Sequence, residues 1–340
     1  MRQPPVEGVD GTLADSVRVL AAGDFTDIAD RFAAAGFGVR LPARGILQIT
    51  ASGQSPKRLS LLLSVGVHGD ETAPIEMLGQ LLAALALAPH ALAVDLMVVV
   101  GNLEAIAQGR RFLDADLNRM FGNRLQRGAL QASGEAARAD LIMRATAAFF
   151  APPGGDKWHL DLHTAIRPSL YPTFAIVPDV IADAAKRALV TWLGGAGVGA
   201  VILNSKLAPT YSAYSATQFC ATSCTAELGQ VGALGKNDLS AFAVTQAALD
   251  ALLRSGQTLA FRRSVPHVFR VVQELVKQSD DFRMAFDQAT QNFTPLEPGI
   301  VVARDGDMVL RVGAATEYVV FPNPAVGVGQ RAGLMVVRQE

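Results

Sequence analysis

Short apolar or alternating runs recur through the first 230 residues, and segments long enough for helices separate them. Runs of this kind are typical of the strands of a covered central sheet. The pattern therefore predicts an α/β fold with a buried central sheet. The expected strands are 59–67, 96–100, 158–162, 174–177, 200–203 and 224–228.

Two segments carry helix signals. Pro74 suits the first turn of a helix over about 74–88, with Asp70 or Thr72 as its capping residue. The second predicted helix, over about 239–254, has an apolar face and ends just before Gly256. We place a domain boundary there, giving domains 1–256 and 257–340.

The pattern changes after this boundary, where short strands are punctuated by Gly, Pro and Asn. Such spacing predicts a smaller β-rich domain. Its expected strands are 265–276, 299–304, 308–312, 318–321 and 334–338.

Composition narrows the class of protein. Of 340 residues 50% are hydrophobic and 18% charged, and the formal net charge is -1, so the chain is globular and has no basic stripe for nucleic acid. The apolar stretch 81–100 is broken by Pro89 and Asp95, which predicts helix, turn and strand and no membrane span. The first residues lack the apolar core of a secretory signal, so we expect a cytoplasmic protein.

The two cysteines, Cys220 and Cys224, supply neither a disulfide framework nor a four-ligand zinc site. We expect both to be reduced, half-buried strand residues.

The first chemical signal is His68-Gly-Asp-Glu71, placed where the strand 59–67 ends. Sites in α/β proteins lie at this edge of the sheet. An imidazole and a carboxylate three residues apart on a tight turn are able to hold one cation, and nitrogen plus oxygen donors suit zinc. Alone, the motif is weak, because the same residues are common in surface turns.

A third donor is expected from the segment 157–163, KWHLDLH. Its period of two puts His159, Asp161 and His163 on one strand face, with His163 at the end. A close pair plus one distant ligand leaves a coordination position open, as in catalytic zinc sites. His159 and Asp161 are expected to pack or to orient ligands rather than to bind metal, and a packing role stays open for His163 as well.

Segment 101–122 carries Arg110, Arg111, Asn118 and Arg119 in a loop-like sequence. Asn118 and Arg119 have the donors to hold a substrate carboxylate by hydrogen bonds. Arg111 has the charge to polarise a carbonyl and stabilise an oxyanion. A solvated charged surface is the alternative.

Glu227 ends an apolar strand, and an unpaired glutamate seldom lies so deep. One interpretation is a general base beside a metal, and the other is a salt bridge to an arginine. The glycine-rich run 194–199 lacks the G-x-G-x-x-G spacing and precedes a strand instead of following one, so it does not indicate a dinucleotide site.

At these residues the chain resembles the aspartoacylase and succinylglutamate desuccinylase family of the zinc carboxypeptidase superfamily. The resemblance rests on four stretches spread over both expected domains: VGVHGDETAPIEML (65–78), WHLDLHTAIR (158–167), CTAELGQVGALGKNDL (224–239) and EYVVFPNPAVGVGQRAGLM (317–335). It implies a three-layer α/β/α domain with a central mixed sheet, followed by a β-rich domain that restricts the cleft.

The resemblance also implies roles for individual residues. His68, Glu71 and His163 would bind one zinc ion per chain, and Glu227 would act as the general base. Arg111 would polarise the scissile carbonyl, and Asn118 with Arg119 would take a substrate carboxylate.

The implied reaction is hydrolysis of N-succinyl-L-glutamate to succinate and L-glutamate, the last step of ammonia-producing arginine catabolism in bacteria. The substrate has three carboxylates, so positive charge must gather locally, from Arg111, Arg119, the metal and a contribution of Arg167 or Lys206. The alternatives are a hydrolase of another N-acyl amino acid, a carboxypeptidase, and a zinc protein without catalysis.

Overall fold

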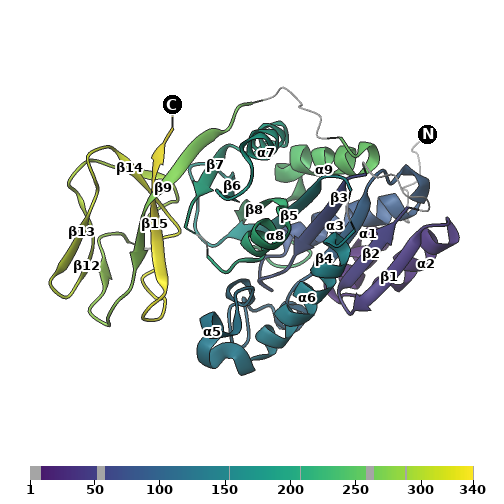
Figure 1. Ribbon diagram of the computed structural model, residues 1–340, viewed down its shortest axis with the longest axis horizontal. Helices are drawn as coiled ribbons and strands as arrows, with labels where there is room; N and C mark the ends of the chain where they lie inside the picture. The colour runs from purple at the N-terminus through teal and green to yellow at the C-terminus, as the bar shows by residue number, and fades with distance from the viewer. Residues whose placement is uncertain are drawn as a thin grey trace, which may run out of the picture.

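A computed structural model describes residues 9–51, 58–152, 154–206, 208–257, 264–287 and 289–339. Within them a twelve-stranded mixed sheet extends from the N-terminal part of the chain into the C-terminal part (Figure 1). In spatial order its strands are β1 (Gly38–Ala43), β2 (Ile46–Thr50), β4 (Asp95–Val100), β3 (Ser60–Val65), β5 (Lys157–Ala165), β8 (Thr222–Gln230), β6 (Thr173–Pro178), β7 (Ala200–Asn204), β9 (His267–Val276), β15 (Arg331–Arg338), β14 (Glu317–Val320) and β11 (Thr294–Leu296).

The centre of the sheet is parallel. Strands β4, β3, β5 and β8 run side by side in one direction, so their carboxyl ends meet at one edge. Side chains alternate across the strands: Leu61 and Leu63 face one core, and Leu62 faces the other. All four strands are buried on both faces, as their apolar runs predict.

Helices cover both faces of the sheet and complete three layers (Figure 1). The larger core lies under α1 (Val9–Ala21), α2 (Thr26–Ala34), α3 (Ala73–Ala86), α7 (Asp183–Gly195) and α9 (Ala243–Ser255). The opposite core lies under α6 (Gly134–Phe150) and α8 (Tyr211–Phe219). The expected α/β/α architecture is therefore confirmed.

Short helices occupy the connections. They are η1 (Pro89–Ala91), α4 (Leu103–Ala107), η2 (Leu117–Arg119), α5 (Arg124–Arg127), η3 (Gly128–Ala132) and η4 (Leu239–Phe242). Two of them, α4 and η2, lie in the segment 101–122 that reads as a loop in the sequence. No helix in the described ranges is both long and apolar enough to cross a membrane.

The C-terminal part is the smaller β-rich domain that the sequence predicts. Its strand β9 pairs in parallel with β7, which joins it to the central sheet, and β15 and β14 continue the sheet in antiparallel order. A second sheet of three strands is formed by β10 (Arg283–Met284), β12 (Val301–Asp305) and β13 (Met308–Arg311).

Three local expectations need correction. Thr72 occupies the position before α3, but its hydroxyl donates to the Gly232 carbonyl (2.6 Å) and does not cap the helix. The first turn of the predicted 239–254 helix is the 3₁₀ helix η4, since Asp238 caps that turn through Ser240 N.

Cys220 is not a strand residue. It is exposed and closes α8 with a left-handed φ of 53°, whereas Cys224 is fully buried in β8; both thiols are free. The first eight residues, on which the expectation about a signal rests, lie outside the described residues, as do residues 258–263 just beyond the predicted boundary.

Candidate metal and catalytic site

The site lies at the carboxyl edge of the parallel strands. His68 follows β3, His163 is near the end of β5, and Glu227 is near the end of β8. The register of the sheet places His163 beside Glu227. Parallel pairing therefore brings together residues that are far apart in the sequence.

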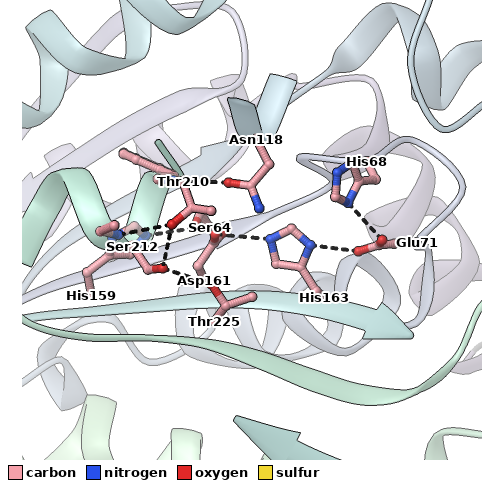
Figure 2. A network of polar contacts seen from close by, with 12 residues as sticks. Ser64, His68, Glu71, Asn118, His159, Asp161, His163, Thr210, Ser212 and Thr225 are labelled. Atoms are coloured by element: carbon pink, nitrogen blue, oxygen red, sulfur yellow. Dashed lines mark hydrogen bonds and ion pairs between the residues drawn. The ribbon is translucent and has the colours of Figure 1, made fainter. Parts of the chain in front are cut away.

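Three donor side chains converge in this place (Figure 2). His68 Nδ1 lies 2.7 Å from Glu71 Oε1, and His163 Nδ1 lies 2.8 Å from Glu71 Oε2. One donor atom from each residue is within 4.8 Å of the other two, and all three side chains are almost fully buried. The structure thus groups the three residues expected to hold a metal.

The tight turn between His68 and Glu71 depends on Gly69. A Cβ on Gly69 would lie 2.3 Å from the Ala105 carbonyl carbon, so only glycine allows the turn to pack against the segment after β4. Glu71 also forms a β-bridge with Gly232, which attaches the turn to the loop after β8.

The three side chains set one another's charge. Burial alone lowers the pKa of His163, but the carboxylates of Asp161 and Glu71 outweigh it and raise that pKa well above its usual value. The pKa of His68 is raised in the same way by Glu71 and Asp116. Burial raises the pKa of Glu71, yet the two histidines hold it well below its usual value. A cation that replaced two imidazole protons would keep this balance of charge.

Carboxylates also face the outer nitrogens of both rings. His163 Nε2 lies 3.0 Å from Asp161 Oδ2, as an ion pair whose angle falls short of a hydrogen bond. His68 Nε2 lies 2.9 Å from Asp116 Oδ1. Asp161 is an expected orienting residue, whereas the sequence analysis does not single out Asp116. In the sequence Asp116 is one carboxylate among several charged residues of segment 101–122, and nothing in its spacing links it to His68.

A row of buried polar side chains continues from Asp161 into the protein (Figure 2). Ser64 Oγ donates to Asp161 Oδ1 (2.5 Å) and lies 2.8 Å from His159 Nε2. His159 Nδ1 lies 2.8 Å from Ser215 Oγ on α8. Burial lowers the pKa of His159 to about 4, so its ring is neutral, and both of its nitrogens are already engaged by serine hydroxyls.

Arg111 lies against the donor set. Its Nη1 donates to Glu71 Oε1 (2.7 Å), and its Nη2 is 3.3 Å from His68 Nε2. The guanidinium is mostly buried, which contradicts the reading of this residue as a solvated surface charge.

Asn118 and Arg119 follow on η2. The Asn118 side-chain oxygen Oδ1 accepts from Tyr211 N (3.0 Å), which leaves the side-chain NH₂ to point toward His163 (Figure 2). Arg119 is half-buried; within the described ranges its guanidinium has no carboxylate at ion-pair distance and bonds only to the Asn118 carbonyl (3.5 Å).

Glu227 is 7% exposed, and within the described part of the chain no arginine pairs with it. The salt-bridge interpretation is therefore not supported. Burial and the negative charge of Glu71 raise the pKa of Glu227 to about 7. A carboxylate tuned to this range both accepts and returns a proton near neutral pH.

The expected contribution of Arg167 or Lys206 to the charge of the site stays a prediction. The Arg167 guanidinium donates to the carbonyls of Asp287 and Thr290 in the C-terminal domain, and Lys206 is exposed. A cation that the sequence analysis does not single out is Arg331, at the start of β15. Burial, and then the like charge of Arg119, lower the pKa of Arg331 to about 10.

A two-histidine, one-carboxylate donor set beside an ionisable buried carboxylate is the arrangement of metal-dependent hydrolases. Comparison with known proteins gives the family. The profile of the succinylglutamate desuccinylase/aspartoacylase catalytic domain matches residues 57–253, and that of the AstE/AspA barrel-sandwich hybrid domain matches residues 264–339. The chain belongs to the succinylglutamate desuccinylase/aspartoacylase family, as its motifs indicate.

Individual relatives agree. A succinylglutamate desuccinylase of Burkholderia thailandensis is 44% identical over 296 residues, which cover 86% of this chain and 84% of that protein. The solved structure of the Vibrio parahaemolyticus protein of that name has a TM-score of 0.81 and 32% identity, covering 90% of this chain and 89% of the other. The solved structure of the Chromobacterium violaceum succinylglutamate desuccinylase has a TM-score of 0.77 and 34% identity, covering 90% of this chain and 92% of the other.

Proposed function

We propose that this protein hydrolyses N-succinyl-L-glutamate to succinate and L-glutamate, in arginine catabolism. The observation that carries the proposal is the convergence of His68, Glu71 and His163 beside Glu227. The substrate is taken from relatives named succinylglutamate desuccinylase that match more than four fifths of the chain.

The donor set fits zinc. Two imidazole nitrogens and one carboxylate, with carboxylates behind both rings, match the ligands and the supporting contacts of catalytic zinc sites. We therefore propose one zinc ion per chain, held by His68, Glu71 and His163. When bound, the ion supplies positive charge that polarises the scissile carbonyl and lowers the pKa of water toward about 7.

Glu227 moves the proton in this proposal. Its carboxylate accepts a proton from the attacking water as the oxygen bonds to the acyl carbon. It then gives that proton to the amide nitrogen as the C–N bond breaks, so glutamate leaves as the amine. A pKa near 7 suits both halves of this transfer.

Arg111 stabilises the charge that develops on the carbonyl oxygen. Its position against Glu71 and His68 places a guanidinium directly beside the metal donors. Donors aimed at developing negative charge in a water-poor site are a large source of rate enhancement.

Asn118, Arg119 and Arg331 recognise the carboxylates of the amino acid. The Asn118 amide is oriented by Tyr211, and Arg119 has a guanidinium free of carboxylates among the described residues, so the pair takes the α-carboxylate. Arg331, whose pKa the charge of Arg119 influences, takes the glutamate side-chain carboxylate. Two guanidiniums that repel one another in the free protein become favourable neighbours once anions lie between them.

The C-terminal domain, from residue 257 onward, restricts the cleft to small acyl-amino acids. Support comes from Arg331 and from the contacts that attach this domain to the loop after β5: Arg167 donates to Asp287 O, and Leu170 N donates to Asn292 O (3.1 Å).

Release of amine from N-succinylglutamate, N-acetylaspartate and a C-terminal peptide, measured with the zinc-loaded protein, tests the proposal. We expect the highest kcat/KM for N-succinylglutamate. A higher value for N-acetylaspartate or for the peptide would assign the protein to another N-acyl amino acid or to carboxypeptidase activity. No hydrolysis at full zinc occupancy would leave a zinc protein without catalysis.

A further inference from the structure

The hydrogen bonds in the row of polar residues behind His163 all run in one direction, from donor to acceptor toward Asp161. Asp161 Oδ1 accepts from the Ser64 hydroxyl, and its other carboxyl oxygen faces His163 Nε2. Ser64 has a single hydroxyl proton and donates it to Asp161. The Ser64 oxygen must then accept from His159, which places the proton of that neutral ring on Nε2.

The remaining nitrogen of His159 completes the order. With its proton on Nε2, Nδ1 is an acceptor, so the Ser215 hydroxyl donates to it. Every group from α8 to Asp161 therefore points its donor toward the site. Asp161 in turn faces Nε2 of His163, which leaves Nδ1 as the atom turned toward Glu71 (Figure 2).

We propose that Ser215, His159 and Ser64 are positioning residues that fix the orientation of Asp161, and through it keep the proton of His163 on Nε2 and Nδ1 free for the metal. The inference rests on the proposed metal site of His68, Glu71 and His163. It adds that the affinity of this site depends on three side chains that touch neither metal nor substrate.

The contrast with His68 supports a specific role for this row. The carboxylate behind His68 is held directly by backbone, because Asp116 Oδ1 accepts from Asn118 N (2.9 Å). Asp161 Oδ1 accepts instead from a serine hydroxyl, which rotates unless a partner fixes it. His159 is that partner, and Ser215 fixes His159 in turn.

Zinc affinity of the metal-stripped protein, measured by competition with a chromophoric chelator, tests the proposal independently of activity. Ser64→Ala should weaken zinc binding about tenfold, the lower end of the usual effect of removing a supporting contact. The matched control is Ser223→Ala on β8, the strand on the other side of β5. Ser223 is equally buried and donates one hydrogen bond, to the Ser212 carbonyl (2.7 Å), but it lies outside the row.

His159 variants add a rescue test. His159→Phe should weaken zinc binding at least as much as Ser64→Ala. His159→Gln should restore part of it, because an amide also accepts at one end and donates at the other. Ring nitrogen shifts of His159, from ¹⁵N NMR of the metal-stripped wild type at neutral pH, should show the proton on Nε2.

Three results would overturn the inference: a proton on Nδ1 of His159, equal zinc affinities of Ser64→Ala and wild type, or equal losses in Ser64→Ala and Ser223→Ala. The Ser64 comparison and the NMR measurement decide the matter if His159→Phe does not fold. If the wild type itself binds no zinc, the proposed metal site fails. If the wild type binds zinc but Ser64→Ala binds it equally tightly, the metal site stands and only the positioning role fails.

Discussion

The two histidines of the donor set face carboxylates in very different surroundings. Behind His163, Asp161 is fully buried and held by side chains of the central strands. Behind His68, the Asp116 side chain is 23% exposed and is held by the backbone of η2. One side of the site is therefore built from sheet register and the other from an irregular connection.

This difference separates two tasks. The strand side carries Glu227 and His163, whose places cannot shift without disturbing the sheet core. The connection side carries Arg111, Asn118 and Arg119, which lie in short helices and turns between β4 and α6. We infer that the strand side supplies the proton transfer and the fixed metal ligand, whereas the connection side supplies Arg111 for the developing oxyanion together with the residues that select the substrate. The selecting residues lie where the sequence changes more readily than in a buried sheet.

Removal of either histidine should have the largest effect, because it removes a ligand. Both His163→Ala and His68→Ala should lose stoichiometric zinc, as measured by metal analysis after dialysis. Only His163→Ala should also destabilise the metal-free protein strongly, by roughly 3–5 kcal/mol, since it leaves the buried Asp161 charge unpaired.

Urea unfolding of the metal-free proteins measures that second effect. The partly exposed Asp116 regains water when His68 is removed, so His68→Ala should unfold at a higher urea concentration than His163→Ala. Equal destabilisation would mean that the two sides do not differ as proposed, and zinc retained by His163→Ala would remove this residue from the metal site.

Glu227→Gln should have the next largest effect, which is on catalysis. It keeps the shape of the side chain but removes the group that carries the proton, so kcat should fall by at least about 100-fold, with zinc content and KM retained. Near-normal kcat at full zinc occupancy would exclude Glu227 from the mechanism. A change confined to stability or KM would indicate a structural role.

The pH dependence of Glu227 has a definite sign. A base must be deprotonated to accept a proton, so kcat/KM should fall as the pH falls through the pKa of Glu227. That pKa is about 7 without metal, and a cation nearby lowers it, so the acid limb should lie at or below about pH 7. Rate profiles of both proteins check this, since the residual activity of Glu227→Gln should lack the acid limb.

On the connection side, removal of Arg111 and removal of Arg119 should change different kinetic constants. Arg111→Ala should lower kcat by about 10²–10³, because its charge is needed where the oxyanion develops. Arg119→Ala should mainly raise KM, by about tenfold or more, since it removes a charged hydrogen bond to a bound carboxylate. If both variants changed only KM, and to the same extent, the two arginines would not have separate roles. If neither variant changed the kinetics, the two arginines would be solvated surface charges without a role in the reaction.

The strand side is also the part that the sequence predicts well. Strands β3, β5 and β8 lie in short apolar or alternating runs, and a histidine or glutamate at the end of such a run stands out as a candidate for chemistry. Helix α8 carries no such signal: it buries serines against His159 and Thr225, so its sequence reads as polar. The alanine-rich α6 has little contrast between its faces.

Asp116 and Arg331 lie outside the sequence predictions for a different reason. Each acts through a neighbour that is distant along the chain, Asp116 through His68 and Arg331 through Arg119, and no periodicity or spacing encodes that proximity. Side chains whose role depends on the packing of irregular segments become visible only in three dimensions.

Arg331→Gln should give the smallest effect and the most selective one. If Arg331 binds the glutamate side-chain carboxylate, the wild type prefers N-succinylglutamate to N-succinylglutamine, whose side chain is uncharged. The ratio of their kcat/KM values should fall about tenfold in the variant. The exposed Arg304 of the same domain supplies the control, and Arg304→Gln should leave the ratio unchanged. Arg331 also pairs with Glu274 (3.6 Å), so a purely structural role would lower both values together and leave their ratio intact. A fall in the ratio would show instead that the C-terminal domain helps to read the substrate, and that recognition is shared between the connection side and β15.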